Sequence, residues 1–215
     1  VDEDIELVRE LVRFLHARSY CAVITTRTLD RAHRIFAVIN DRGLPLARGD
    51  ILKAQILGAI PPERREPPAQ RWRETEIALD GSLDELFSHL RTIEGRPRGR
   101  ILEEIRAILA RSGDAEAFLD RLMFPYAAIL AAIRRKGKAG AVPSPELRTF
   151  LGYLYWLGSH DWTPPLMLYW RLVDGDEAML LPFIRRLDRL AYSLKILGLG
   201  QDKRSARYRA LTDAI

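Results

Sequence analysis

Apolar residues recur along this chain at spacings of three and four positions, the repeat of a helix with one buried face. The first such segment, residues 4–18, carries the apolar set Ile5, Val8, Leu11, Val12 and Leu15. Further segments with this repeat predict helices over 28–43, from 50 onward, and over 72–79, 83–90, 101–109, 115–135, 146–159, 165–173, 177–197 and 202–215. The sequence therefore predicts a chain built almost entirely of helices.

Two stretches depart from this repeat. Residues Cys21–Thr26 are short and partly β-branched, which suits a strand or an isolated extended segment packed on helices. Residues 61–71 contain four prolines and are mostly charged, so we expect a loop or bend there. We predict an all-α fold, an irregular bundle of about ten helices with at most one short extended segment near the N-terminus.

A charged stretch with Gly and Pro after residue 134 is the best candidate for a linker. It gives a soft boundary at 137–145, between a helical domain over 1–136 and a C-terminal helical subdomain over 146–215 packed on it. The length of 215 residues suits one large or two small domains.

Composition excludes several classes of protein. No run of about 18 apolar residues is present, so no membrane span is expected, and the acidic start is unlike a signal peptide. The single cysteine excludes an internal disulfide and a Cys-rich zinc site, which fits a reduced, cytoplasmic setting. The chain begins at Val1 rather than Met, so we expect a piece of a longer protein.

The charge balance is basic, with a net charge of +5 and an isoelectric point near 9.5. Of the 34 basic residues, 29 are Arg and 5 are Lys. Arg is the better fork-shaped ligand for phosphate, whereas a genome rich in Arg and Ala codons produces the same bias without any function. The charge permits contact with nucleic acid and does not require it.

One polar stretch interrupts two apolar helical segments and carries a recognisable pattern. Phe36 and Ile39 precede Asn40-x-Arg42-Gly43, Leu46 follows, and Asp50-x-Leu52-Lys53 opens the next segment. This order resembles the F-x-x-[IL]-N-x-R-G-x-x-L-x-x-x-D-[IL]-L-K segment of the GmrSD-type restriction endonuclease family, in the protein of the S half. Asp161–Tyr169 and Phe183–Ile215 resemble later helices of that family more weakly.

The resemblance implies the helical region of a bacterial, nucleotide-dependent restriction or phage-defence nuclease. In that family a ParB/sulfiredoxin-like domain precedes this region, and an HNH-type nuclease domain follows or lies on a partner. The family's Asp-Gly-Gln-Gln-Arg signature and the HNH residues are absent from this chain. We therefore expect no catalytic site and no cofactor here, with a nucleoside triphosphate and a divalent metal bound elsewhere in the full-length protein.

The motif residues Asn40, Arg42, Asp50 and Lys53 are the first candidate site, at a domain junction or facing a phosphate. The structural alternative has Asn40 bonding open carbonyls at a helix end and Arg42 pairing with Asp50, which would hold the joint in shape. Lys53 lies one turn into the second helix and should project toward the same joint.

A second candidate is a basic face for nucleic acid, set against a solvated helix face. It comprises Arg185, Arg186, Arg189, Lys203, Arg204 and Arg207. The aromatic residues Trp156, Trp162, Trp170, Tyr153, Tyr155 and Tyr169 could stack on bases, but we interpret them as core.

No nucleophile–base pair or phosphate-binding glycine loop is recognisable, and the four histidines His16, His33, His89 and His160 lack the spacing of metal ligands. The expected partners are the other domains of the enzyme or a partner subunit, and DNA. The alternatives are a stand-alone helical DNA-binding module and a helical scaffold for protein interaction.

Overall fold

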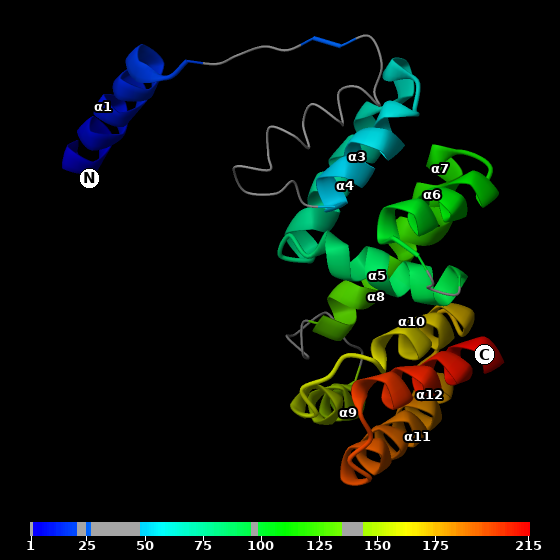
Figure 1. The fold of residues 1–215 in the computed structure, drawn as a ribbon. Coiled ribbons are helices and arrows are strands. Elements are labelled where there is room, and N and C mark those ends of the chain that lie inside the picture. The colour runs from blue at the N-terminus through cyan, green and yellow to red at the C-terminus, as the bar shows by residue number, and fades with distance from the viewer. Residues whose placement is uncertain (1, 21–24, 27–47, 96–98, 135–143) are drawn as a thin grey trace. The chain divides into compact units, whose positions relative to one another are not determined.

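A computed structural model describes residues 2–20, 25–26, 48–95, 99–134 and 144–215 (Figure 1). The chain divides into two compact units, residues 1–46 and 47–215, and each is described by itself. In the first unit, helix α1 runs over Asp2–Arg18, as its apolar spacing predicts. The expected helix over 28–43 and most of the Cys21–Thr26 segment lie outside the described residues.

The second unit is a succession of helices (Figure 1). They are α3 (Arg48–Gly58), η1 (Pro62–Arg64), α4 (Glu66–Ala78), α5 (Leu83–Glu94), α6 (Ile101–Arg111), α7 (Ala115–Phe118), η2 (Leu119–Met123), α8 (Phe124–Arg134), α9 (Pro145–Trp156), α10 (Thr163–Leu172), α11 (Glu177–Ile196) and α12 (Gln201–Ala214). The described residues contain no strand, and the predicted all-α bundle is confirmed.

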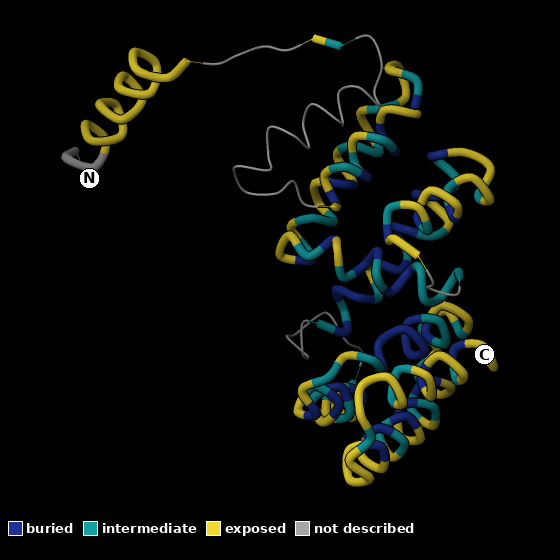
Figure 2. Tube along the Cα trace, viewed as in Figure 1, coloured by how far each residue is buried: buried dark blue, intermediate teal, exposed yellow. Residues whose placement is uncertain are grey.

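Helix α5 lies at the centre of this unit, in contact with α3, α6, α8, α10 and α12. Its side chains Leu86, Phe87 and Leu90 are fully buried. Figure 2 colours much of the Cα tube in the middle of this unit as buried. Trp72 of α4 packs against Phe87 with ring centroids 6.2 Å apart. Burying such side chains contributes about 1.5–3 kcal/mol each, so α5 is the element around which the others assemble.

The prediction of a non-helical loop over 61–71 is wrong, because a 3₁₀ turn and the start of α4 occupy it. Pro67 and Pro68 lie in the first turn of α4, where a backbone N–H would have no intrahelical partner in any case. Arg65 secures the bend by donating from its guanidinium to the carbonyl of Ile60 at 2.8 and 3.2 Å.

The single helix expected over 115–135 is interrupted. Asp114 caps its start by accepting from the amide of Ala117 at 2.7 Å. The turn η2 then has the wider π geometry, after which α8 resumes ordinary helix. A π turn inserts one residue and re-aims the side chains after it, which an apolar repeat does not reveal.

Helices α9 and α11 lie side by side and run in the same direction. Arg185 pairs with Glu146, the Tyr192 hydroxyl donates to the carbonyl of Tyr153, and Lys195 donates to the carbonyl of Leu157. In each pair the α11 residue lies 38 or 39 positions after its α9 partner, so the register is constant along both helices.

The boundary expected at 137–145 falls almost entirely on residues outside the described ones. The helices on its two sides are packed together: α10 contacts α5 and α8, and α12 contacts α5. No helix among the described residues has the length and apolar character needed to cross a bilayer.

The first turn of α3 approaches α5 closely, and this generates a test. A Cβ added at Gly49 would lie 3.2 Å from the Cβ of Leu83, whose position the backbone of α5 fixes. We expect Gly49→Ala to lower the free energy of unfolding by about 1–2 kcal/mol, because overpacking here exceeds the gain in helix propensity. Chemical denaturation measures it.

Gly58→Ala is the matched control, since Gly58 ends the same helix and a Cβ there would meet nothing within 4 Å. It should be neutral or stabilising by a few tenths of a kcal/mol. Equal effects of the two substitutions would contradict the close contact between α3 and α5.

Candidate functional site

The structure describes the second half of the sequence motif and not the first. Asn40 and Arg42, and with them the expected Arg42–Asp50 pair, lie outside the described residues. Asp50 is an exposed acidic residue in the first turn of α3, where negative charge favours the helix. Lys53 lies one turn further on, and its Nζ donates to both carboxylate oxygens of Glu76 at 2.8 and 2.9 Å.

Glu76 connects Lys53 to the core. Its Oε1 also accepts from the indole Nε1 of Trp72 at 3.0 Å, and Trp72 is fully buried. The start of α3 is held as well, since the amide of Gly49 donates to Asp84 Oδ1 at 2.9 Å. The second half of the motif is therefore a rigid part of the helical body, with Lys53 compensating a half-buried carboxylate.

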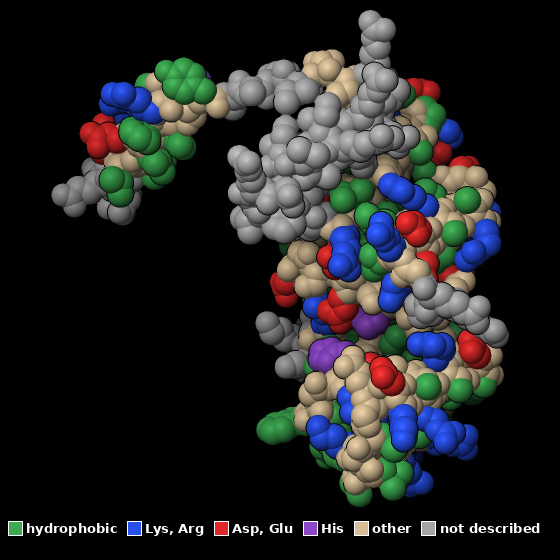
Figure 3. Space-filling model, in the orientation of Figure 1, with side chains coloured by type: hydrophobic (Ala, Val, Ile, Leu, Met, Phe, Trp, Pro, Cys, Tyr) green, Lys and Arg blue, Asp and Glu red, His purple; other side chains and the backbone are tan. Residues whose placement is uncertain are grey.

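The predicted basic face is divided. Arg185 forms an ion pair with Glu146, and Arg204 turns inward, donating to the carbonyl of Leu199 at 2.8 Å. The remaining members, Arg186, Arg189, Lys203 and Arg207, are exposed. Figure 3 shows Lys and Arg side chains gathered over the part of the surface formed by α11 and α12. Contact of this face with nucleic acid stays a prediction.

The aromatic residues separate into core and surface. Trp162 and Trp170 are buried, as interpreted from the sequence. The core interpretation is wrong for Trp156 and Tyr153, which are 86% and 48% exposed. The reason is that α9 buries the stripe Leu147, Leu151 and Leu154, and Tyr153 and Trp156 lie off that stripe.

One concave feature of the described residues is a hollow of about 350 Å³ between α5, the N-terminal end of α10 and α12, which we call the polar groove. It is lined by Ser88, His89, Arg91, Thr92, His160, Asp161, Pro164, Gln201, Ser205, Tyr208, Arg209 and Thr212. Figure 3 shows histidine side chains reaching the surface near the middle of this unit. Nearly every lining residue carries a polar group, which is unusual for a gap left by imperfect packing.

A half-buried carboxylate positions the histidines of the groove. Glu85, one turn before His89 on α5, contacts His89 Nε2 at 3.3 Å and accepts from Arg134 at 2.5 Å. His160 Nδ1 lies 3.9 Å from the same carboxylate, and its ring stacks on Trp162. The hydrogen bond from His89 lowers the pKa of Glu85, helped by Arg134 and opposed by burial.

Unsatisfied polar atoms gather at the groove. Among the described residues, four buried side-chain nitrogen or oxygen atoms lack a hydrogen-bond partner. Arg91 Nε and Asp161 Oδ2 belong to lining residues, and Arg204 Nε lies 3.8 Å from that Asp161 oxygen. Arg204 and Asp161 form an ion pair with each other, and these buried atoms lie in the wall of the groove, closed to solvent.

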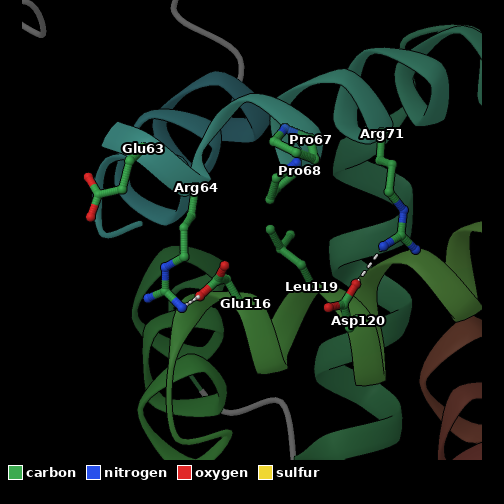
Figure 4. A pocket seen from close by; sticks show the side chains of 8 residues that line it. All are labelled: Glu63, Arg64, Pro67, Pro68, Arg71, Glu116, Leu119 and Asp120. Atoms are coloured by element: carbon green, nitrogen blue, oxygen red, sulfur yellow. Dashed lines mark hydrogen bonds and ion pairs between the residues drawn. The ribbon is translucent and has the colours of Figure 1, made fainter. Parts of the chain in front are cut away.

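A second hollow, between the start of α4 and the α7–η2 segment, differs in this respect (Figure 4). Arg64 pairs with Glu116 at 3.1 Å, and Arg71 pairs with Asp120 at 2.5 Å. Figure 4 shows these two ion pairs bridging the hollow on either side of the prolines. The facing charges therefore neutralise each other where these helices meet.

Sequence reasoning did not group the residues of the polar groove. His89 and His160 were noted only as scattered histidines, and Asp161 and Tyr208 were not considered as site residues. The one available signal was polar Ser88, His89 and Thr92 beside the buried stripe of α5. That signal does not say which distant helix those side chains face.

The Glu85 cluster predicts a pH-dependent contribution to stability. Glu85→Gln should lower the free energy of unfolding by about 1–3 kcal/mol at pH 7, because it removes charge-assisted bonds to His89 and Arg134. Since folding lowers the pKa of Glu85, its contribution is complete above the ordinary value of 4.5 and is lost as the pH falls through the folded pKa. Urea unfolding of both proteins from pH 7 to 3 measures this.

Glu94→Gln is the control on the same helix, with the opposite sign. Burial raises the pKa of Glu94, so its carboxylate disfavours folding at neutral pH and the penalty fades in acid. We expect this variant to be no less stable than the parent protein at pH 7. A Glu85→Gln deficit that stays unchanged from pH 7 to pH 3 would contradict the assignment.

In comparisons with known proteins, no family model, no curated protein and no solved structure matches this chain.

Proposed function

We propose that this chain is the helical region of a GmrSD-like, nucleotide-dependent restriction or phage-defence nuclease. Its role is to couple a nucleotide-handling domain to DNA and to a nuclease domain. The proposal originates in the sequence pattern from Phe36 to Lys53. The chemistry of hydrolysis and cleavage belongs, in this proposal, to other domains or to a partner subunit.

The observation that supports it most is the anchoring of the motif's second half. Lys53 is bound to Glu76, and Glu76 to the core residue Trp72. Gly49 is bound to Asp84 at the start of α5. A displacement applied at the motif therefore reaches the central helix through packed side chains and hydrogen bonds, which a coupling element requires.

Helix α1 supplies the second support. Its apolar residues are exposed, and they form the set Ile5, Leu7, Val8, Leu11, Val12, Phe14 and Leu15, each at least 47% accessible. An exposed apolar helix face of this length is typical of an interaction surface. In the proposed enzyme, the preceding nucleotide-handling domain covers this face.

The test uses the longest open reading frame that contains this sequence. We expect its product to hydrolyse a nucleoside triphosphate. Arg42→Ala should reduce the hydrolysis rate at least about tenfold, because it removes one charge-assisted hydrogen bond to a phosphate or across the domain junction. Lys53→Met should reduce it several-fold by releasing Glu76. Phosphate release, with circular dichroism to check folding, measures both.

Lys203→Met is the control, since it removes a lysine of the same charge that is exposed on α12 and outside the motif. Its hydrolysis rate should stay within about twofold of the parent. Hydrolysis that is undetectable in the longer product, or unchanged in Arg42→Ala, would contradict the proposed coupling.

A stand-alone single-strand-binding role is the second candidate, favoured by the exposure of Trp156. Tyr153 lies one turn before it on α9, and Tyr192 and Lys195 reach across from α11. Exposed aromatic rings beside cations such as Arg189 are the elements of a base-stacking surface. The other tryptophans, Trp72, Trp162 and Trp170, are buried.

This distribution makes tryptophan fluorescence a specific probe of the α9–α11 face. An oligo(dT) strand at low salt should quench mainly Trp156, and Trp156→Phe should abolish most of the quenching. Trp156→Ala should weaken binding roughly tenfold, as expected for one lost base stack, and affinity should fall steeply with salt.

Leu172→Ala is the matched exposed apolar control, because Leu172 is 65% accessible on α10. It should leave the affinity unchanged. An absence of quenching and of any mobility shift at low salt would remove this second candidate.

A further inference from the structure

The polar groove has the size and composition of a small-ligand site, independently of the function proposed above. Its volume of about 350 Å³ lies at the lower end of the roughly 300–1,000 Å³ range of ligand pockets. Residues 201, 205, 208, 209 and 212 line it from α12, a spacing that places them on one face of that helix. The opposite wall is residues 88–92 of α5, with His160, Asp161 and Pro164 between them.

Part of the groove offers hydrogen-bond acceptors. The hydroxyls of Thr92 and Thr212 donate to the carbonyls of Ser88 and Tyr208, at 3.1 and 2.9 Å. Ser205 donates to Asp161 Oδ1 at 3.3 Å, while Asp161 Oδ2 lies 3.8 Å from Arg204 Nε. A hydroxyl that already donates its proton can only accept a further hydrogen bond. These groups therefore suit a ligand that carries hydroxyl donors.

Another part offers positive charge and donors. Arg91 uses Nη1 on Glu104 at 3.2 Å, and its side chain remains 27% accessible. Arg209 is exposed at the groove and forms no ion pair with the residues that the structure describes. The negative charge of Asp161 is offset by Arg204 alongside it. Arg209 is thus left as an uncompensated charge, which favours an anion.

Tyr208 adds a neutral donor within the groove. Burial raises the pKa of Tyr208 to about 12, with a further increase from Asp161 and a decrease from Arg204. The phenol therefore keeps its proton at physiological pH and can donate to a ligand oxygen. At the other end of the groove, helix α12 begins after Gly200 without a side-chain cap, so amides of its first turn add donors near Gln201.

We propose that the polar groove binds a small hydroxylated anion of the sugar-phosphate class. Arg209 and Arg91 contact the phosphate, and the hydroxyls of Thr92, Thr212 and Ser205 together with Asp161 accept from the sugar hydroxyls. Inorganic phosphate would contact only the cationic residues of this lining, and a neutral sugar would contact only the hydrogen-bond acceptors.

The probe is D-ribose 5-phosphate, added to the isotope-labelled chain and followed by NMR through the amide and histidine ring signals. Ribose and inorganic phosphate are titrated separately. We expect shifts of His89, His160 and the α12 residues facing the groove, with ribose 5-phosphate binding at least about tenfold more tightly than phosphate. Ribose alone should bind more weakly still.

Arg209→Glu should weaken ribose 5-phosphate binding at least about tenfold, as expected for a reversed charge at the phosphate. Arg207→Glu is the matched control, since it makes the same charge change on the same helix and does not line the groove. It should change the affinity less than about twofold.

Thr212→Val tests the acceptor part and should weaken ribose 5-phosphate while leaving phosphate unchanged. Three results would overturn the proposal: no shift of groove residues, equal effects of the two arginine substitutions, or phosphate binding as tightly as ribose 5-phosphate.

Discussion

The burial of helix α5 is the constraint on which the rest of the second unit depends. Five helices contact it, and its Leu86, Phe87 and Leu90 side chains are completely enclosed. Each neighbouring helix loses solvent from one face by packing there, which is the main favourable contribution to folding. The positions of the motif residue Lys53 and of the polar groove follow from this arrangement. Each lies where a helix that packs on α5 carries polar residues at the edge of the contact.

Charged groups at those edges are satisfied in pairs that link distant helices. Glu76 joins Lys53 of α3 to Trp72 of its own helix, and Glu85 joins α5 to Arg134 at the end of α8. A half-buried carboxylate without such partners would disfavour folding, and the raised pKa of Glu94 illustrates that cost. These pairs therefore orient the helices as much as they stabilise them.

The two proposals concern separate parts of the molecule and can fail separately. The coupling role concerns α1 and the motif that ends at Lys53, and its readout is nucleotide hydrolysis. The sugar-phosphate site concerns α5, α10 and α12, and its readout is binding. The polar groove stands apart from the charge-paired hollow at Arg71 and Asp120 because its lining residue Arg209 forms no ion pair with the residues that the structure describes.

The sequence by itself determined the fold class and most helix boundaries, since the apolar repeat is local and a helix forms its hydrogen bonds within itself. It failed at Pro67 and Pro68, whose place in the first turn of α4 depends on where the helix starts. Only the tertiary structure decided that Lys53 faces Glu76, that Trp156 is exposed, and that His89, Asp161 and Tyr208 meet in one groove. Those facts depend on which helix faces are paired, and residues on different helices carry no local signal of their proximity.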